Sequence, residues 1–342
     1  MIIGNRHQAL GNSNKLKLVA YALCALLFAL CVSAEAQQTT KIPRIGYISG
    51  TGNQTNQGPY VAALRQGLRE LGYVEGKNFT IEYRGAEGKP DREPSLAAEL
   101  IERQVNVLIV ATLPAILAAK QATKTTPIIM VATLDPVANK LVDSLARPGG
   151  NLTGISTLAQ DLNAKRLELL MEVVPRLSRV AVLRDVDSQT ATLHFKEYGA
   201  AARVLKIELQ SLDVRGPNPA LENALLAATK GRNDALITIT NANLFLQQKR
   251  VADLAIRNKL PSMFQGSTWV DSGGLMSYST DELGAFRRAA TYVDKILKGT
   301  KPADLPVEQM TKFEFAINLN TAKQIGLDIP QSVLFRADKA IK

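Results

Sequence analysis

The sequence is poor in the side chains on which much enzyme and metal chemistry depends. It holds two cysteines, Cys24 and Cys31, and two histidines, His7 and His194, in 342 residues. Three of these four lie in the first 36 residues, which we expect to be removed, so the remaining chain has no thiol and one histidine. This excludes disulfides, thiolate metal sites, cysteine nucleophiles and zinc sites built from several histidines. We therefore expect no metal site and an ordinary surface or half-buried role for His194.

Several motifs of nucleotide-binding proteins and hydrolases are also missing. The sequence has no phosphate-binding loop of the Gly-x4-Gly-Lys-Ser/Thr type and no Gly-x-Ser-x-Gly nucleophile elbow. Gly50 and Gly52 begin like a dinucleotide fingerprint, but Thr55 stands where the third glycine belongs. We therefore expect no cofactor.

Positive charge is in excess but is not concentrated. Lysine and arginine number 41 against 31 acidic residues, a formal charge of +10. Because basic residues are scattered and aromatic residues make up only 5%, the sequence shows no stripe of the kind that binds nucleic acid. No helix-turn-helix segment precedes the first strand, which argues against a repressor. We expect a solvated basic surface and no nucleic-acid partner.

The N-terminus has the pattern of a secretory signal peptide. Basic residues come first, then an apolar run of 15 residues, then two small residues: Arg6, Lys15 and Lys17, residues 18–32, and Ala34 and Ala36. The run is short for a membrane span, although an N-terminal anchor is the alternative. Leu30 before Cys31 argues against a lipoprotein. We expect cleavage after Ala36, with residues 1–36 as the signal peptide, and a periplasmic protein.

Short apolar runs alternate with amphipathic stretches over the rest of the chain. Continuous apolar strands between amphipathic helices indicate parallel sheets covered on both faces, so the predicted class is α/β with two doubly wound lobes. Residues 147–151 are the candidate crossing between the two sets. The expected strands are 44–50, 79–83, 105–111, 127–133, 180–185, 207–212, 235–240 and 262–265, and the expected helices 60–71, 96–103, 114–123, 162–174, 191–205, 220–229 and 244–258.

Such lobes bind ligands at the carboxyl ends of their strands and in the cleft between them. Hydroxyls, amides and glycines follow the strands there, at helix N-termini that suit a carboxylate. The alternative is that they serve only as helix caps and tight turns. The candidate ligand-binding residues are Ser49, Gly50, Thr51, Thr112, Pro114, Ala115, Thr133, Asp135, Asp185, Asn241, Phe264 and Gln265.

Five stretches together resemble a known family. They are residues 68–78 (LRELGYVEGKN), 145–154 (LARPGGNLTG), 291–299 (TYVDKILKG), 301–309 (KPADLPVEQ) and 317–326 (INLNTAKQIG). They resemble the ABC-transporter substrate-binding proteins of the tryptophan-type branch, from about residue 42 to 341. The resemblance implies a type I periplasmic-binding fold, two lobes joined by a hinge of several strands, and delivery of a small solute to a permease. Characterised relatives favour aromatic amino acids.

This fold implies discontinuous lobes. We expect residues 42–153 and 277–307 in the first lobe and residues 154–276 and 308–342 in the second. The expected helix 282–298 returns to the first lobe before residues 313–317 add a strand to the second. A hinge near residues 151–155, 275–278 and 306–311 is expected to close the cleft on the ligand.

The function expected is that of an extracytoplasmic solute-binding receptor of an ABC importer, monomeric and without catalysis. Its partners are a small amino acid or similar carboxylate and a membrane permease with its cytoplasmic ATPase. The alternatives are a sensor that docks to a signalling receptor and a secreted α/β enzyme using Asp135 or Asp185, although a catalytic carboxylate needs a positioned partner.

The expected ligand contacts divide into three groups. The anionic end of the ligand is expected at Thr112, Ala115 and Thr133, which lie at strand-to-helix turns of the first lobe. An ammonium group is expected at Asp135 or Asp185. Tyr60 and Phe264 are candidates for stacking on the ligand, with core packing as the alternative.

Overall fold

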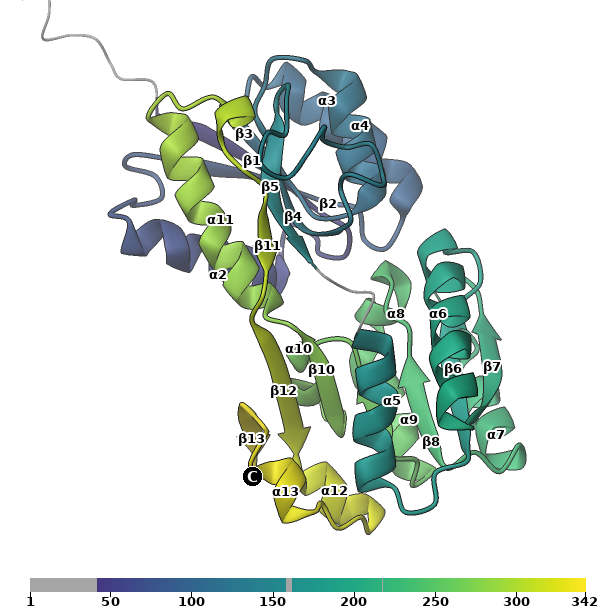
Figure 1. Ribbon diagram of the computed structural model, residues 1–342. Coiled ribbons are helices and arrows are strands. Elements are labelled where there is room, and N and C mark those ends of the chain that lie inside the picture. The colour runs from purple at the N-terminus through teal and green to yellow at the C-terminus, as the bar shows by residue number, and fades with distance from the viewer. Residues whose placement is uncertain (1–41, 158–161, 217) are drawn as a thin grey trace, which may run out of the picture. The chain divides into compact units, whose positions relative to one another are not determined.

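The computed structural model describes residues 42–157, 162–216 and 218–342, so the expected signal peptide lies outside the described residues. From Pro43 onward the chain forms two α/β lobes, each built on its own sheet (Figure 1). Among the described helices, none combines the length and the apolar composition needed to cross a bilayer.

The first lobe contains a six-stranded sheet whose strands all run parallel. Its strand order is β11-β5-β4-β3-β1-β2, which is typical of a doubly wound sheet. The strands are β1 (Arg44–Ser49), β2 (Thr80–Gly85), β3 (Val107–Val110), β4 (Ile128–Leu134), β5 (Leu152–Thr157) and β11 (Glu308–Met310).

Helices cover both faces of this sheet. α2 (Gly58–Glu70) and α11 (Glu282–Leu297) lie side by side on one face, and α3 (Glu93–Glu102) and α4 (Leu113–Ala122) lie on the other (Figure 1). Successive side chains of a strand point to opposite faces, so Tyr47 packs beneath α2 and α11 while Ile48 packs beneath α3 and α4. A short 3₁₀ turn, Pro90–Arg92, leads into α3.

The second lobe contains a seven-stranded sheet of mixed direction. Its order is β13-β12-β10-β9-β8-β6-β7, and only β10 and β12 pair antiparallel. The strands are β6 (Arg179–Asp185), β7 (Glu208–Val214), β8 (Ala235–Thr238), β9 (Ser262–Phe264), β10 (Met276–Thr280), β12 (Phe313–Asn318) and β13 (Lys339–Ile341).

The antiparallel pair follows from the route of the chain. β10 ends where the chain leaves the second lobe, and β12 begins where the chain returns from β11, so Thr280 lies opposite Phe313. Because both ends lie at the same crossing, β12 must run back along β10. The expectation of purely parallel sheets is corrected at this one pair, and the predicted α/β class is confirmed.

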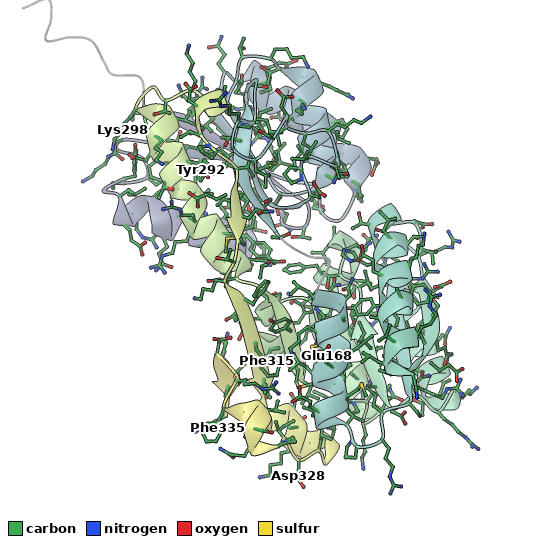
Figure 2. All side chains as sticks on the ribbon, in the orientation of Figure 1. Glu168, Tyr292, Lys298, Phe315, Asp328 and Phe335 are labelled. Atoms are coloured by element: carbon green, nitrogen blue, oxygen red, sulfur yellow. The ribbon has the colours of Figure 1, made fainter. Side chains whose placement is uncertain are left out.

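Helices also cover both faces of the second sheet. One face carries α5 (Leu162–Val173), α6 (Gln189–Leu205), α12 (Leu319–Ile325) and α13 (Gln331–Leu334), packed on a core that includes Phe315 of β12 (Figure 2). The other carries α7 (Leu221–Lys230), α8 (Ala242–Leu246), α9 (Gln248–Arg257) and α10 (Ser267–Asp271). The expected helix 244–258 is therefore two helices that meet at Gln247.

The chain passes between the sheets after β5, after β10 and after β11. All of β5 and β11 belongs to the first sheet and all of β10 to the second. Two of the crossings are joined to each other. The Asp281 N–H donates to the Lys312 carbonyl (3.1 Å), and the Lys312 ammonium lies 3.3 Å from the Asp281 carboxylate.

Candidate functional site

The turn after β1 is shaped by its own serine. Ser49 Oγ accepts hydrogen bonds from the N–H groups of Gly52 (3.0 Å) and Thr51 (3.3 Å). Gly50 packs against Thr112, since a Cβ at Gly50 would lie 2.9 Å from the Thr112 methyl carbon. The structure thus brings the predicted residues of β1 and β3 together, with the Ser49 oxygen engaged in the turn.

A buried carboxylate that the sequence did not single out lies beside Thr112. Glu93, at the start of α3, is 2% exposed and accepts a hydrogen bond from the Thr112 hydroxyl at 2.6 Å. Burial raises the pKa of Glu93, and its hydrogen bonds with Thr112 and the Ala115 N–H offset part of that rise.

Glu93 bears on the expected position of the ligand carboxylate. Thr112 caps α4 by accepting a hydrogen bond from the Ala115 N–H (3.3 Å), and its hydroxyl donates a hydrogen bond to Glu93. Ala115 is fully buried, while Pro114 is exposed on the first turn of α4. An anion bound at this turn would meet the like charge of Glu93, which argues against an anionic subsite there.

The turn after β4 presents an exposed carboxylate. Thr133 lies on β4 opposite Ser156 of β5. Asp135 follows with φ +23°, in the left-handed region that non-glycine residues rarely adopt, and its carboxylate accepts a hydrogen bond from the Ala138 N–H at 2.9 Å. Asp135 therefore stabilises its own turn and stays in contact with solvent.

Asp185, at the end of β6, is buried and well bonded. Its Oδ2 accepts from the side-chain amides of Asn241 (2.8 Å) and Asn243 (2.9 Å), and its Oδ1 accepts from the Asp187 N–H (3.1 Å). Asn241 also caps α8 by accepting from the Leu244 N–H. The structure thus brings the predicted pair Asp185 and Asn241 together, in a contact that fastens α8 to the sheet.

Of the two remaining candidates in this lobe, one lies in the core. Phe264 is fully buried and stacks on Trp269 with ring centroids 4.7 Å apart, so core packing replaces its expected contact with the ligand. Gln265, the next residue, accepts a hydrogen bond from the Thr240 N–H at 2.8 Å.

Tyr60 joins side chains of both lobes. Its ring stacks on Phe286 of α11, with centroids 4.8 Å apart, and touches Phe245 of α8 in the second lobe at 5.8 Å. Its hydroxyl donates to Glu282 Oε2 at the first turn of α11. Burial raises the pKa of both groups; for Glu282 the hydrogen bond from Tyr60 and the charge of Arg166 oppose the rise.

A small hollow opens beside this hydrogen bond. Both lobes line it, through Tyr60, Gly266, Ser267, Thr268, Ser279, Thr280, Glu282 and Leu283. It has room for roughly one water-sized group. Thr268 Oγ1 is buried and lies near the Tyr60 hydroxyl.

Comparison with known families decides what kind of protein carries these features. The family model described as ABC transporter substrate binding protein matches residues 57–341. The chain belongs to this family. Its lobes, crossings and strand-end residues are therefore those of a substrate-binding protein, a family that works outside the cytoplasm with a small-molecule ligand and an ABC permease.

Individual relatives agree with this assignment. This substrate-binding protein is 26% identical over 261 residues to a tyrosine-binding protein of Clostridioides difficile, covering 76% of this chain and 74% of that one. A conserved domain protein of Vibrio cholerae shares 27% identity and a TM-score of 0.77, covering 88% of this chain and 100% of that one. A domain from Streptococcus pneumoniae, solved in complex with L-Trp, has the same coverage, 24% identity and a TM-score of 0.76, and shows the fold.

The histidine of this substrate-binding protein lies away from the hollow. His194 Nδ1 is 3.1 Å from Glu197 Oε2 and 3.2 Å from the side-chain amide of Asn163. Burial lowers the pKa of His194, and the charge of Glu197 opposes that shift. Within residues 42–157, 162–216 and 218–342, no three histidine or acidic side chains are grouped so as to hold a metal ion.

Proposed function

We propose that this protein is the periplasmic solute receptor of an ABC importer and that it captures an amino acid or a similar small carboxylate between its lobes. The contact of Tyr60 with Glu282 in one lobe and Phe245 in the other is the observation that carries the proposal. It sets a polar hollow beside aromatic rings at the carboxyl ends of both sheets, which is where open α/β folds bind ligands. The ligands named for the relatives, tyrosine and L-Trp, support an aromatic amino acid.

The receptor releases its ligand unchanged. The alternative of a secreted enzyme relied on Asp135 or Asp185, and each of these carboxylates already accepts hydrogen bonds from its own surroundings. The proposal includes export with cleavage after Ala36, so that Gln37 begins the exported protein, and a monomer that meets the permease with its ligand held. The rest of the ligand would lie against Tyr60 and the strand-end residues, with Pro114 and Asp135 at exposed positions and Thr51 at a half-buried one.

A thermal-shift screen of amino acids, purines, sugars and aromatic acids, followed by calorimetry, tests this function. We expect an aromatic amino acid to raise the melting temperature most, because binding to the folded state alone stabilises it. If the best hit has neither a carboxylate nor an amine, the assignment of an amino-acid ligand is wrong, but the proposed receptor function still holds. Failure of every class to bind would contradict the receptor itself.

A further inference from the structure

The hollow beside Glu282 has the chemistry of a cation subsite. Glu282 brings a carboxylate, Tyr60 a phenol, and four serine or threonine residues bring hydroxyls: Ser267, Thr268, Ser279 and Thr280. Of the eight lining residues, none is basic. An ammonium group carries three donors and no acceptor, so it matches a hollow that offers one negative charge and several hydroxyl oxygens.

The size of the hollow restricts what can enter it. With room for roughly one water-sized group, it accepts the head of a primary ammonium but excludes a carboxylate or an aromatic ring. The bulk of a ligand would stay outside, beside the rings of Tyr60 and Phe245.

Three other carboxylates near the strand ends already have partners or lie in solvent. Asp185 accepts three hydrogen bonds, and Glu93 accepts one from the Thr112 hydroxyl. Asp135 is exposed, where an ion pair contributes little. Each is a weaker partner for a cation than a partly desolvated carboxylate with free lone pairs.

Glu282 has that free capacity. The Tyr60 hydroxyl is its one hydrogen-bond donor among the described residues, whereas an ionised carboxylate can accept about four. Arg166 lies near enough to lower the pKa of Glu282, but its guanidinium is held by the Tyr278 carbonyl and the Asn163 side chain and makes no ion pair with it. Glu282 is half-buried, so its charge is partly desolvated and has few partners, and an ammonium group would offset part of that cost.

From these observations we propose that Glu282 is the carboxylate that binds the ammonium group of the ligand. The hydroxyl oxygens of Thr268 and its neighbours accept the other hydrogen bonds of that ammonium group. The ligand class is therefore a primary amine, and an α-amino acid in particular. This inference rests on the proposed receptor function and makes it specific. Since Glu282 belongs to the first lobe and Thr268 to the second, an ammonium bound here touches both lobes.

Calorimetry with L-tyrosine, L-tryptophan and L-phenylalanine tests the assignment in the full exported chain. We expect Glu282→Gln to weaken the binding of the best of these amino acids by about tenfold or more, because it removes a charge-assisted hydrogen bond. Thr268→Val should weaken it by about fivefold through loss of one neutral acceptor. Glu102→Gln, the same change on the exposed end of α3, is the matched control and should bind as the parent does. The melting temperature of each unliganded variant verifies that it is folded.

The deaminated analogue of the best amino acid, such as 3-(4-hydroxyphenyl)propionate for tyrosine, provides the second readout. We expect the parent to bind it at least about tenfold more weakly than the amino acid. Binding of the amino acid by Glu282→Gln within twofold of the parent would overturn the assignment and leave the receptor function intact. So would a parent that binds the deaminated analogue as tightly as the amino acid. A parent that binds no small molecule in the wider screen contradicts the receptor function and the assignment together.

Discussion

Asp234 shows how one carboxylate can join the starts of two neighbouring strands. It directly precedes β8, and its Oδ2 accepts from the N–H groups of Ser178 (2.8 Å) and Arg179 (2.9 Å) at the start of β6 and from the Ser178 hydroxyl (3.0 Å). Partial burial by itself raises the pKa of Asp234, but these hydrogen bonds favour the ionised form more strongly, and the pKa lies below its ordinary value. The ionised carboxylate therefore stabilises the folded state relative to the unfolded state.

Replacing Asp234 by asparagine should lower the free energy of unfolding by about 1 kcal/mol at pH 7, since a charged acceptor becomes a neutral one. Because the pKa is lower in the folded state, this stabilisation is present above about pH 4, the unfolded pKa, and is lost as the pH falls through the folded pKa. Urea unfolding at pH 7 and pH 3 should show the difference between parent and variant shrinking in acid. Asp328→Asn replaces an exposed residue of the second lobe (Figure 2) and should change the free energy of unfolding little at either pH. An equal difference at both pH values would contradict the argument.

Single residues of the site were only partly predictable. Polar residues after apolar strands could be recognised from order alone, which is how Asp185 and Asn241 were predicted, and the structure places these two side chains in contact. Glu93 and Glu282 were missed because their partners, Thr112 and Tyr60, lie 19 and 222 residues away along the chain. Phe264 was chosen because it ends a strand, and only the packing against Trp269 shows that it belongs to the core.

At the scale of elements, the contact between α2 and α11 positions the proposed ammonium subsite, because α2 carries Tyr60 and α11 carries Glu282. The two helices approach closely at Gly67, where a Cβ would lie 2.3 Å from the Arg287 carbonyl oxygen. No larger side chain fits without moving one helix away from the other, so the glycine sets the spacing of the pair.

Gly67→Ala should therefore destabilise the protein by about 1–3 kcal/mol, the range for inserting a group into a packed interface. Gly199→Ala is the control: Gly199 lies inside α6 with no atom within 4 Å of a Cβ built there, so alanine should raise stability by about 0.5–1 kcal/mol. Chemical denaturation measures both. If the free energy of unfolding changed with the same sign in both variants, the close approach of the two helices at Gly67 would not explain the effect of Gly67→Ala.

Elements formed from nearby residues were predictable, and those formed by distant pairing were less so. Apolar runs and helical periodicity predict β1 to β4, β6 to β9 and the helices from α2 to α9. β5, β10 and β13 were not among the expected strands, and α10, α12 and α13 were not among the expected helices. β11 was missed because it is three residues long and pairs with β5 about 150 residues earlier. The break between α8 and α9 was missed because the apolar spacing continues through it.

At the scale of the whole molecule, the proposed mechanism is closure about the crossings between the sheets. Asp281 and Lys312 hold two of these crossings together through a backbone hydrogen bond and an ion pair. Small-angle scattering should show a smaller radius of gyration in a saturating concentration of the bound amino acid, because a ligand that touches both lobes favours the arrangement in which both hold it. An unchanged radius with a ligand shown to bind would contradict closure.

The late position of α11 and β11 in the sequence has a consequence for how the protein is made. When a ribosome has synthesised the first 281 residues, the first lobe still lacks the helix that covers Tyr47, Ile109 and Ile129 and the strand that completes its sheet. The growing chain therefore cannot finish its first lobe until almost all of it has been synthesised. In a protein that we propose is exported, the first lobe would thus remain incomplete during most of its synthesis.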